Sequence, residues 1–295
     1  MDAVITYVDN LDPQWQKEYA QYAGEAQLSK RFRDWGTLRY LLRGIEVNMP
    51  FIHNVYLVVS SESQVPAWVK TPAVRVVLHK DIIPQEFLPI FNSCSIEMFL
   101  HRIPGLAEEF LYFNDDMFPV APCRREDFFV DGKSAINFAK HVLPFGMYKS
   151  QCKMASNLAR KALGMGPCAV FVRPQHTCSP ILKSFSAKAY EAVEEDILAS
   201  VTRLRVKNQP NQYLFLDYLY WGGQTVKGEI SNKHLSQAVY SGEQIAKYIM
   251  EPQTKLACIN DVQMPDEKFE KMRAQILAGF EAAFPDKSRF EKDGH

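Results

Sequence analysis

Two adjacent carboxylates close an apolar run in FLYFNDDMF, which spans residues 110–118. Strands often end in Asp or Asn, so Asp115 and Asp116 are read either as a solvated strand end or as ligands of a cation. Because Mg²⁺ prefers carboxylate oxygens together with phosphate oxygens and water, the second interpretation requires a charged substrate. A second β-like run, KLACINDV, also ends in an amide and a carboxylate, Asn260 and Asp261. The sequence leaves open whether the two ends converge.

Arginines form a second group of candidates in RFRDWGTLRYLLR, which begins at Arg31. Arg39 and Arg43 are four residues apart and share a helix face. A solvated basic face is one interpretation, and it is favoured for Arg43. The alternative is a phosphate clamp that includes Arg31, Arg33 and Arg39, because guanidinium groups bind phosphate in a bidentate manner.

Two histidines and one further arginine give weaker signals of a functional site. His101 follows Glu97 by four residues, His176 lies in a proline-rich loop, and Arg205 belongs to TRLR. Each pattern fits a surface position as well as a site. The sequence has no P-loop, no G-x-G-x-x-G and no G-x-S-x-G, which disfavours the ordinary kinase, ATPase, NAD-binding and α/β-hydrolase classes.

The elements that must position these residues alternate along the first ~120 residues. Strands are expected at 3–8, 54–61, 74–81 and 109–116, and helices at 36–49 and 93–103, with Ser93 as the N-cap. This order predicts an α/β fold with a mostly parallel sheet covered by helices. Ligands bind at the carboxyl ends of such strands. Polar residues gather at those ends: Asp9, Asp12, Ser60, Ser61, His79, Asp81 and Asn114 to Asp116.

The rest of the chain predicts helices at 186–201, 212–223 and 265–285 and a short strand at 255–262. Residues from about 124 to about 180 are expected to form a helical insertion or cover. We therefore expect one α/β catalytic domain, residues 1–295, with that subdomain inserted in it.

Composition restricts the class of protein. Lys+Arg and Asp+Glu both number 34, and a formal net charge of zero disfavours nucleic acid as a partner. The six cysteines form no C-x-x-C pair and are expected to be reduced thiols. The N-terminus lacks signal-peptide features, and no run is long enough to span a bilayer. A cytoplasmic location is expected, and peripheral contact with the inner face of the membrane stays open.

Four blocks of the sequence resemble the Stealth family of bacterial capsular polysaccharide hexose-1-phosphate transferases, which includes the catalytic part of GlcNAc-1-phosphotransferase. DAVITYVDNLDPQW resembles the first block, and the stretch from RFRDWG to FLYFNDDMF resembles the second nearly end to end. RPQHTCSPILKS with TRLR and YLFLDYLY resembles the third, and CINDV with FEKMRAQILAGFEAAFP resembles the fourth. The resemblance implies a Rossmann-like, GT-A-like sheet.

The resemblance also implies a reaction. A UDP-sugar, commonly UDP-GlcNAc, donates sugar-1-phosphate to a hydroxyl of a glycan or lipid-linked glycan, and UMP leaves. Positioning and charge stabilisation dominate such phosphoryl-type transfer. A divalent cation, Mg²⁺ or else Mn²⁺ or Ca²⁺, is implied as the cofactor. The alternative function is a metal-dependent glycosyltransferase that releases UDP; a non-catalytic nucleotide-sugar binding module is a third.

Residue roles are carried over from the matching blocks. Catalytic roles fall on Asp9, Asp115, His101, His176 and Arg205, with the general base open among the first four. Substrate binding falls on Asp12, Arg33, Arg39, Ser60 and Asn92, and metal binding on Asp116 with Asn260 or Asp261. The stretch 151–172 has no counterpart in the blocks, which leaves acceptor binding open.

Overall fold

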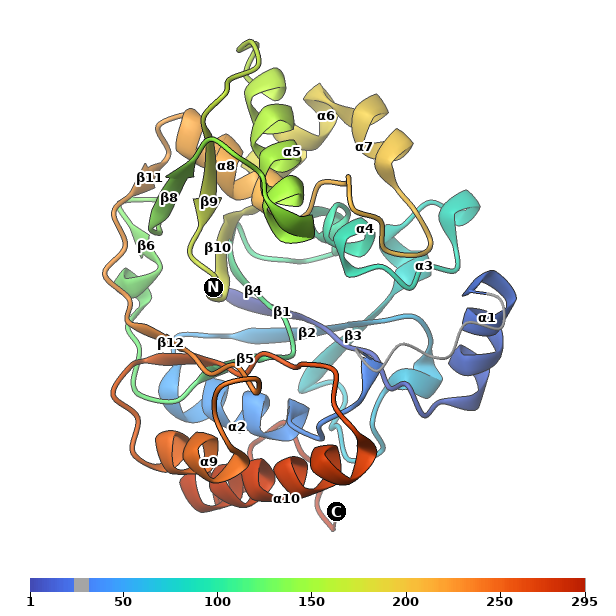
Figure 1. Ribbon diagram of the computed structural model, residues 1–295, viewed down its shortest axis with the longest axis vertical. Coiled ribbons are helices and arrows are strands. Elements are labelled where there is room, and N and C mark those ends of the chain that lie inside the picture. Colours follow the sequence, from blue (N-terminus) through green and yellow to red (C-terminus); the bar gives the residue numbers. More distant parts are fainter. Residues whose placement is uncertain (24–31, 295) are drawn as a thin grey trace. The chain divides into compact units, whose positions relative to one another are not determined.

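The computed structural model describes residues 1–23 and 32–294, and they form two compact units (Figure 1). Unit 1 comprises Met1–Asp2, Val77–Tyr112 and Glu126–Glu229. Unit 2 comprises Ala3–Val76, Phe113–Arg125 and Ile230–His295. Each unit is therefore assembled from segments that are far apart in the sequence. Arg31 of the predicted phosphate clamp lies outside the described residues.

The chain is an α/β protein with a parallel sheet and flanking helices, which confirms the predicted fold class. Its largest sheet has the strand order β10-β4-β1-β2-β3. The bounds are Asp2–Thr6 for β1, Asn54–Val59 for β2, Val74–Leu78 for β3, Glu109–Phe113 for β4 and Ser179–Leu182 for β10. Strand β10 runs antiparallel to β4, with Ile181 opposite Phe110. The prediction for β3 was wrong at its end, because the chain turns there into helix α3, His79–Ile82.

Unit 2 contains four helices among its described residues: α1 (Pro13–Ala23), α2 (Leu38–Asn48), α9 (Gly242–Met250) and α10 (Asp266–Ala283). Helix α2 buries Leu38, Leu41, Leu42 and Ile45, the face that their spacing predicts. Figure 1 shows α9 alongside α10. A Cβ at Gly279 would lie 2.6 Å from the Ala246 Cα, so only glycine lets these two helices pack this closely.

Arg43 joins α2 to the C-terminal segment in a buried ion pair. Its guanidinium donates to Glu291 Oε1 at 2.8 Å and to the Phe284 carbonyl at 2.7 Å, and Arg43 is 3% exposed. The alternative of a solvated basic face, favoured from the sequence, is therefore wrong for this residue. The pair instead fixes the chain terminus against α2.

Replacing Arg43 with methionine is expected to lower the free energy of unfolding by about 3 kcal/mol, because Glu291 would be buried without its partner. Chemical denaturation at pH 7 measures this change. Arg289→Met is the matched control, since the Arg289–Glu46 pair is 3.9 Å apart and half exposed. Equal losses in the two variants would contradict the assignment.

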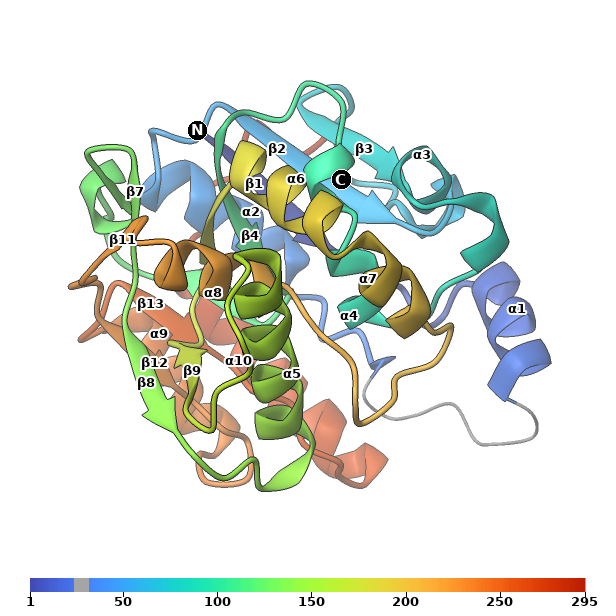
Figure 2. The ribbon, with the colours of Figure 1, turned by 90° about the horizontal axis from the view of Figure 1, so that it is seen from above.

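Unit 1 holds the helices α4 (Ser93–Glu97), α5 (Gly146–Ala162), α6 (Lys183–Ala192), α7 (Glu194–Ser200) and α8 (Tyr213–Trp221). Its short strands are β6 (Phe129–Val130), β7 (Lys133–Ala135), β8 (Phe138–His141), β9 (Phe171–Pro174) and β11 (Thr225–Val226). Figure 2 shows β8, β9 and α8 beside α5. Two boundary predictions were wrong: residues 186–201 span two helices, and α4 ends at Glu97, followed by a 3-10 turn at Leu100–Arg102.

The segment predicted as a helical insertion, about 124–180, contains one α-helix and several short strands. Its part from Glu126 onward belongs to unit 1. The single-domain organisation stays a prediction. Within the described ranges, no helix is both long and apolar enough to cross a membrane.

Candidate active site

The two acidic chain segments of unit 2 are brought together by a β-ladder. Strand β13 (Leu256–Cys258) pairs antiparallel with β5 (Met117–Pro119), and Cys258 lies opposite Met117. The residue before β5 therefore meets the residues after β13, and the Ile259 amide donates to the Asp116 carbonyl at 2.9 Å. The ladder continues into β12 (Asn232–His234). The convergence that the sequence left open is thus a consequence of strand register.

We call Asp34, Asp115, Asp116 and Asp261 the acidic cluster. Crowding of Asp115 by the protein and the negative charges of Asp116, Asp34 and Asp261 raise its pKa to about 7, although its side chain still reaches solvent. Burial likewise raises the pKa of Asp261, and Arg33 partly offsets this. A hard divalent cation binds well to carboxylates that repel one another, because its positive charge relieves their repulsion.

Asp34 is a member of this cluster that the sequence reasoning missed. Its Oδ1 accepts from the Gly36 amide at 2.8 Å, and its Oδ2 accepts from the Tyr7 hydroxyl at 3.1 Å. Burial raises the pKa of Asp34, and the charge of Asp9 adds to the effect. Asp34 lies two residues before Gly36, a spacing that is typical of an Asx turn. This is the sequence signal that could have identified Asp34.

Asp9 and Asp12 are held by Gln64, which follows β2. The Gln64 side chain accepts from the Asp9 amide at 2.7 Å and donates to Asp12 Oδ2 at 3.0 Å. Asp12 also accepts the Gln14 amide at 2.7 Å, which makes it the cap of α1. Asp9 lies near Asp34, whereas Asp12 is occupied in fixing the loop. Ser60 lies at the end of β2, half-buried.

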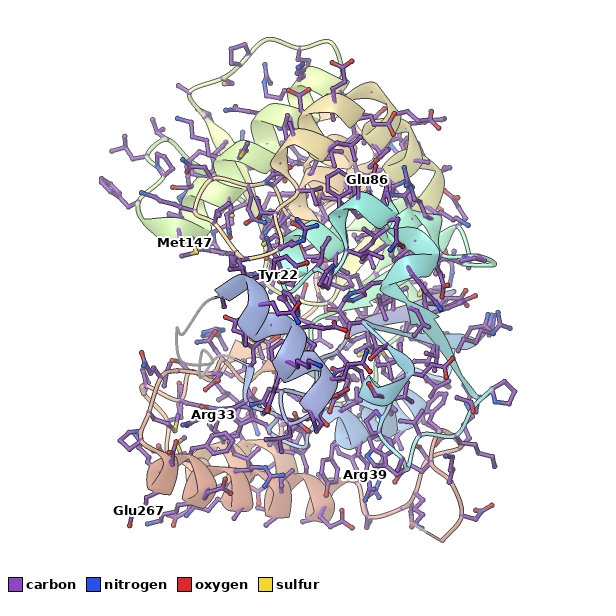
Figure 3. The ribbon with its side chains drawn as sticks, turned by 90° about the vertical axis from the view of Figure 1, so that its right-hand side faces the viewer. Tyr22, Arg33, Arg39, Glu86, Met147 and Glu267 are labelled. Carbon is purple, nitrogen blue, oxygen red and sulfur yellow. The ribbon has the colours of Figure 1, made fainter. Side chains whose placement is uncertain are left out.

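The two predicted phosphate-binding arginines of unit 2 lie apart (Figure 3). Arg33 lies at the start of α10, where it pairs with Asp266, donates to the Met264 carbonyl and covers the Phe269 ring. Arg39 instead contacts Glu291 at 3.3 Å and lies over the Trp68 ring. Only Arg33 is therefore placed beside the acidic cluster. Phosphate contact stays a prediction for both.

In unit 1, Asn92 and Arg205 fasten one loop to α4. Asn92 is the N-cap of α4, in place of the predicted Ser93, and its amide donates to Gln209 Oε1 at 3.1 Å. Arg205 donates to Ser93 Oγ at 2.8 Å and to Cys94 Sγ at 3.2 Å. The exposed guanidinium is thus held at the amino end of α4, and guanidinium groups bind phosphate in a bidentate manner.

His176 belongs to a chain of hydrogen bonds in unit 1. Its Nδ1 lies 3.1 Å from the Tyr213 hydroxyl, which is 2.9 Å from the Tyr148 hydroxyl. Burial raises the pKa of Tyr213 far above its usual value. Glu97, on α4, accepts from the Gln212 amide at 3.0 Å, so α8 is docked at the residue before Tyr213. The phenol therefore orients the imidazole ring, a function that Tyr213 acquires only in the tertiary structure.

His101 lies in the core of unit 1. Its ring centroid is 4.9 Å from that of Tyr190 and 6.0 Å from that of Phe215, and His101 is 8% exposed. Burial and the positive charge of Arg102 lower its pKa to about 4. Its catalytic role stays a prediction.

His101 is expected to make the fold sensitive to acid. Its pKa is lower in the folded chain, so the unfolded chain binds more protons between pH 6.5 and pH 4, and stability falls as the pH falls through that range. In His101→Leu the loss of unfolding free energy between pH 7 and pH 4.5 should be smaller by on the order of 2 kcal/mol. Denaturation at both pH values measures it, and identical losses would contradict the assignment.

Each cluster suits one part of a phosphoryl transfer. The acidic cluster of unit 2 offers oxygen ligands to a divalent cation, with Asn260 at the same turn. Arg205 and His176 of unit 1 offer a bidentate phosphate donor and an oriented imidazole. The residue types that the sequence singled out therefore fall into two chemically different groups.

The second conserved region of the Stealth proteins matches residues 31–136. The chain is 31% identical, over 99% of both sequences, to the capsular polysaccharide phosphotransferase WcwK of Streptococcus pneumoniae. It is 30% identical to the exopolysaccharide phosphotransferase cps2G of Lactiplantibacillus plantarum over 99% of this chain and 96% of that protein. Among solved structures, the galactosyltransferase LgtC aligns with a TM-score of 0.39 at 11% identity, covering 93% of this chain and 95% of that one. The near-complete match to the phosphotransferases shows that the chain is a transferase and belongs to the Stealth family.

Proposed function

We propose that the protein transfers hexose-1-phosphate, most commonly GlcNAc-1-phosphate, from a UDP-sugar to a hydroxyl of a glycan or lipid-linked glycan, in the synthesis of a capsule or surface polysaccharide. The observation that carries the proposal is the acidic cluster, whose mutually repelling carboxylates suit a cation–diphosphate pair. The phosphotransferase names of full-length relatives support the reaction type.

In this reaction the acceptor oxygen attacks the β-phosphorus of the donor. A new P–O bond forms, the bond between the β-phosphorus and the bridging oxygen breaks, and UMP departs with that oxygen. A divalent cation, when bound, offsets the charge of the diphosphate. Asp116 with Asp115, Asp261 and Asn260 would hold it, and Mg²⁺ is our first choice.

The remaining steps fall on the protein's own side chains. We assign the acceptor proton to Nε2 of His176, because Tyr213 at Nδ1 fixes the orientation of the ring. Arg205 would neutralise the transferred phosphate, since a planar guanidinium binds two of its oxygens at once. Asp9 and Arg33 would contact the nucleotide from the loops that hold them. Positioning and charge, rather than covalent chemistry, then supply the rate enhancement.

The test is a donor screen with UDP-sugars labelled at the β-phosphorus, each with Mg²⁺, Mn²⁺ or Ca²⁺ and with chelator. We expect release of UMP, label in the acceptor product, and loss of turnover with chelator. Release of UDP that retains the label would establish a glycosyltransferase and overturn the proposal. Absence of turnover with every donor, together with donor binding, would favour the binding module.

A further inference from the structure

Five large apolar side chains stand exposed in one short segment of unit 1, the connection from β8 into the first turn of α5. Val142, Leu143, Phe145, Met147 and Tyr148 are between 39% and 74% exposed. We call residues 142–148 the apolar loop. Figure 2 shows it joining the end of β8 to the start of α5, and Met147 is labelled in Figure 3. Such a run is unusual on a surface, where exposed apolar residues are normally scattered singly.

The apolar loop is presented by rigid elements. Helix α5 is anchored in the unit by Cys152, Ala155, Leu158 and Ala159, which are buried. Strand β8 is paired with β9, with His141 opposite Phe171 at the edge of the loop. The connection between these two anchored elements therefore carries Val142, Leu143 and Phe145 outside the core of the unit, and their exposure calls for a partner.

The charge around the loop indicates which kind of partner. Residues 132–190 contain nine lysines and arginines and no aspartate or glutamate, in a chain of zero net charge. Lys140 is exposed beside the loop, and Arg173 donates to His141 Nε2 at 3.2 Å. Lys149 lies near enough to His141 to affect its charge. An apolar tip bordered by Lys140, Lys149 and Arg173 is complementary to an anionic lipid surface, which combines negative headgroups with a hydrocarbon layer.

We propose that the apolar loop inserts into an anionic phospholipid surface, with Lys140 and Lys149 at the headgroups. Phe145 is the main anchor, because its ring carries no polar group and it is the most exposed of the five at 74%. Tyr148 marks the inner end of the loop, because its hydroxyl is held 2.9 Å from that of the buried Tyr213 and its ring does not insert. This inference goes beyond the proposed function and does not depend on it, because lipid binding requires neither donor nor turnover.

The test is flotation of the full chain with vesicles of phosphatidylcholine alone or of phosphatidylcholine mixed with phosphatidylglycerol. We expect binding to the mixed vesicles that weakens as salt is added. Leu143→Ser/Phe145→Ser should lower partitioning at least about tenfold. Val239→Ser is the matched control, since Val239 is also 74% exposed but lies in unit 2, and it should bind like the parent.

A second pair of variants tests the charge. Lys140→Gln/Lys149→Gln should lower binding to the mixed vesicles about tenfold, whereas Lys268→Gln/Lys287→Gln, at exposed positions of unit 2, should have little effect. Thermal melts check that each variant is folded. Failure to float with the mixed vesicles, or equal binding by the loop variant and the Val239 control, would overturn the proposal. Self-association that the loop variant abolishes, seen by sedimentation without lipid, would point instead to a second copy of the chain.

Discussion

Replacing Asp116 with asparagine is expected to lower kcat/KM by a factor on the order of 10² to 10³ and to weaken cation binding about 10- to 100-fold. Asparagine keeps the shape of the side chain but removes one negative charge from the acidic cluster. It can still accept from the Cys258 thiol, whose sulfur lies 3.5 Å from Asp116 Oδ2. Steady-state kinetics and a Mn²⁺ titration followed by calorimetry measure the two effects.

The same variant separates a ligand role from a packing role. Without cation, Asp116→Asn should be at least as stable as the parent, because one source of repulsion in the cluster is gone. With cation, the parent should gain thermal stability and the variant should gain much less. Asp286→Asn, at an exposed position of unit 2, is the matched control and should follow the parent in every measurement. An unchanged cation affinity in Asp116→Asn would remove this residue from the proposed metal site.

Replacing Arg205 with lysine is expected to lower kcat by a factor of about 10² while cation affinity stays at the parent value. Lysine keeps the charge but presents a single point of contact, so it cannot bind two phosphate oxygens in a fixed plane. Arg205→Gln should lose more, because it also removes the charge. Product release measured under single-turnover conditions, with cation affinity in parallel, checks both expectations.

Two controls separate the loss of phosphate contact at Arg205 from a general loss of charge or of folding. Lys207→Gln removes an exposed positive charge two residues away and should leave kcat nearly unchanged, if geometry rather than local charge matters. Circular dichroism and thermal melts should be the same for all three variants, since Asn92 holds this loop independently of Arg205. Full activity in Arg205→Lys would show that no bidentate contact is made there.

Local sequence patterns predicted much of the secondary structure. The spacing of apolar residues located α2, because burial of one face leaves its period in the sequence. An aromatic-rich run that ends at two glycines located α8, and β-branched runs located the first strands. Boundaries were less accurate. Helix α4 is shorter than its pattern because the chain changes to a 3-10 turn after Glu97, and such changes depend on tertiary packing.

The candidate site likewise combines residues that the sequence identifies with residues that only the tertiary structure identifies. Asp115, Asp116 and Asp261 could be found from the sequence because each belongs to a short polar stretch that follows an apolar run, where a strand ends. Asp34 does not follow an apolar run, and its sequence signal is only the Asx-turn spacing to Gly36. The structure brings its charge close to Asp115. Likewise, Tyr213 reads as one aromatic of a buried helix until its hydroxyl is found beside His176.

Residue types and their order along the chain determined the α/β class, the family and the list of carboxylates and basic groups. They could do so because strand ends, helix faces and family blocks are local features. Only the tertiary structure decided which of these groups act together. The antiparallel register of β5 and β13 places Asp116 at the turn that carries Asn260 and Asp261, although 143 residues of sequence separate the two strand ends at Asp116 and Ile259. Arg43, which shares a helix with Arg39, is drawn into a buried ion pair for the same reason: its partner Glu291 lies 248 residues away in the chain, and only folding brings the two charges together.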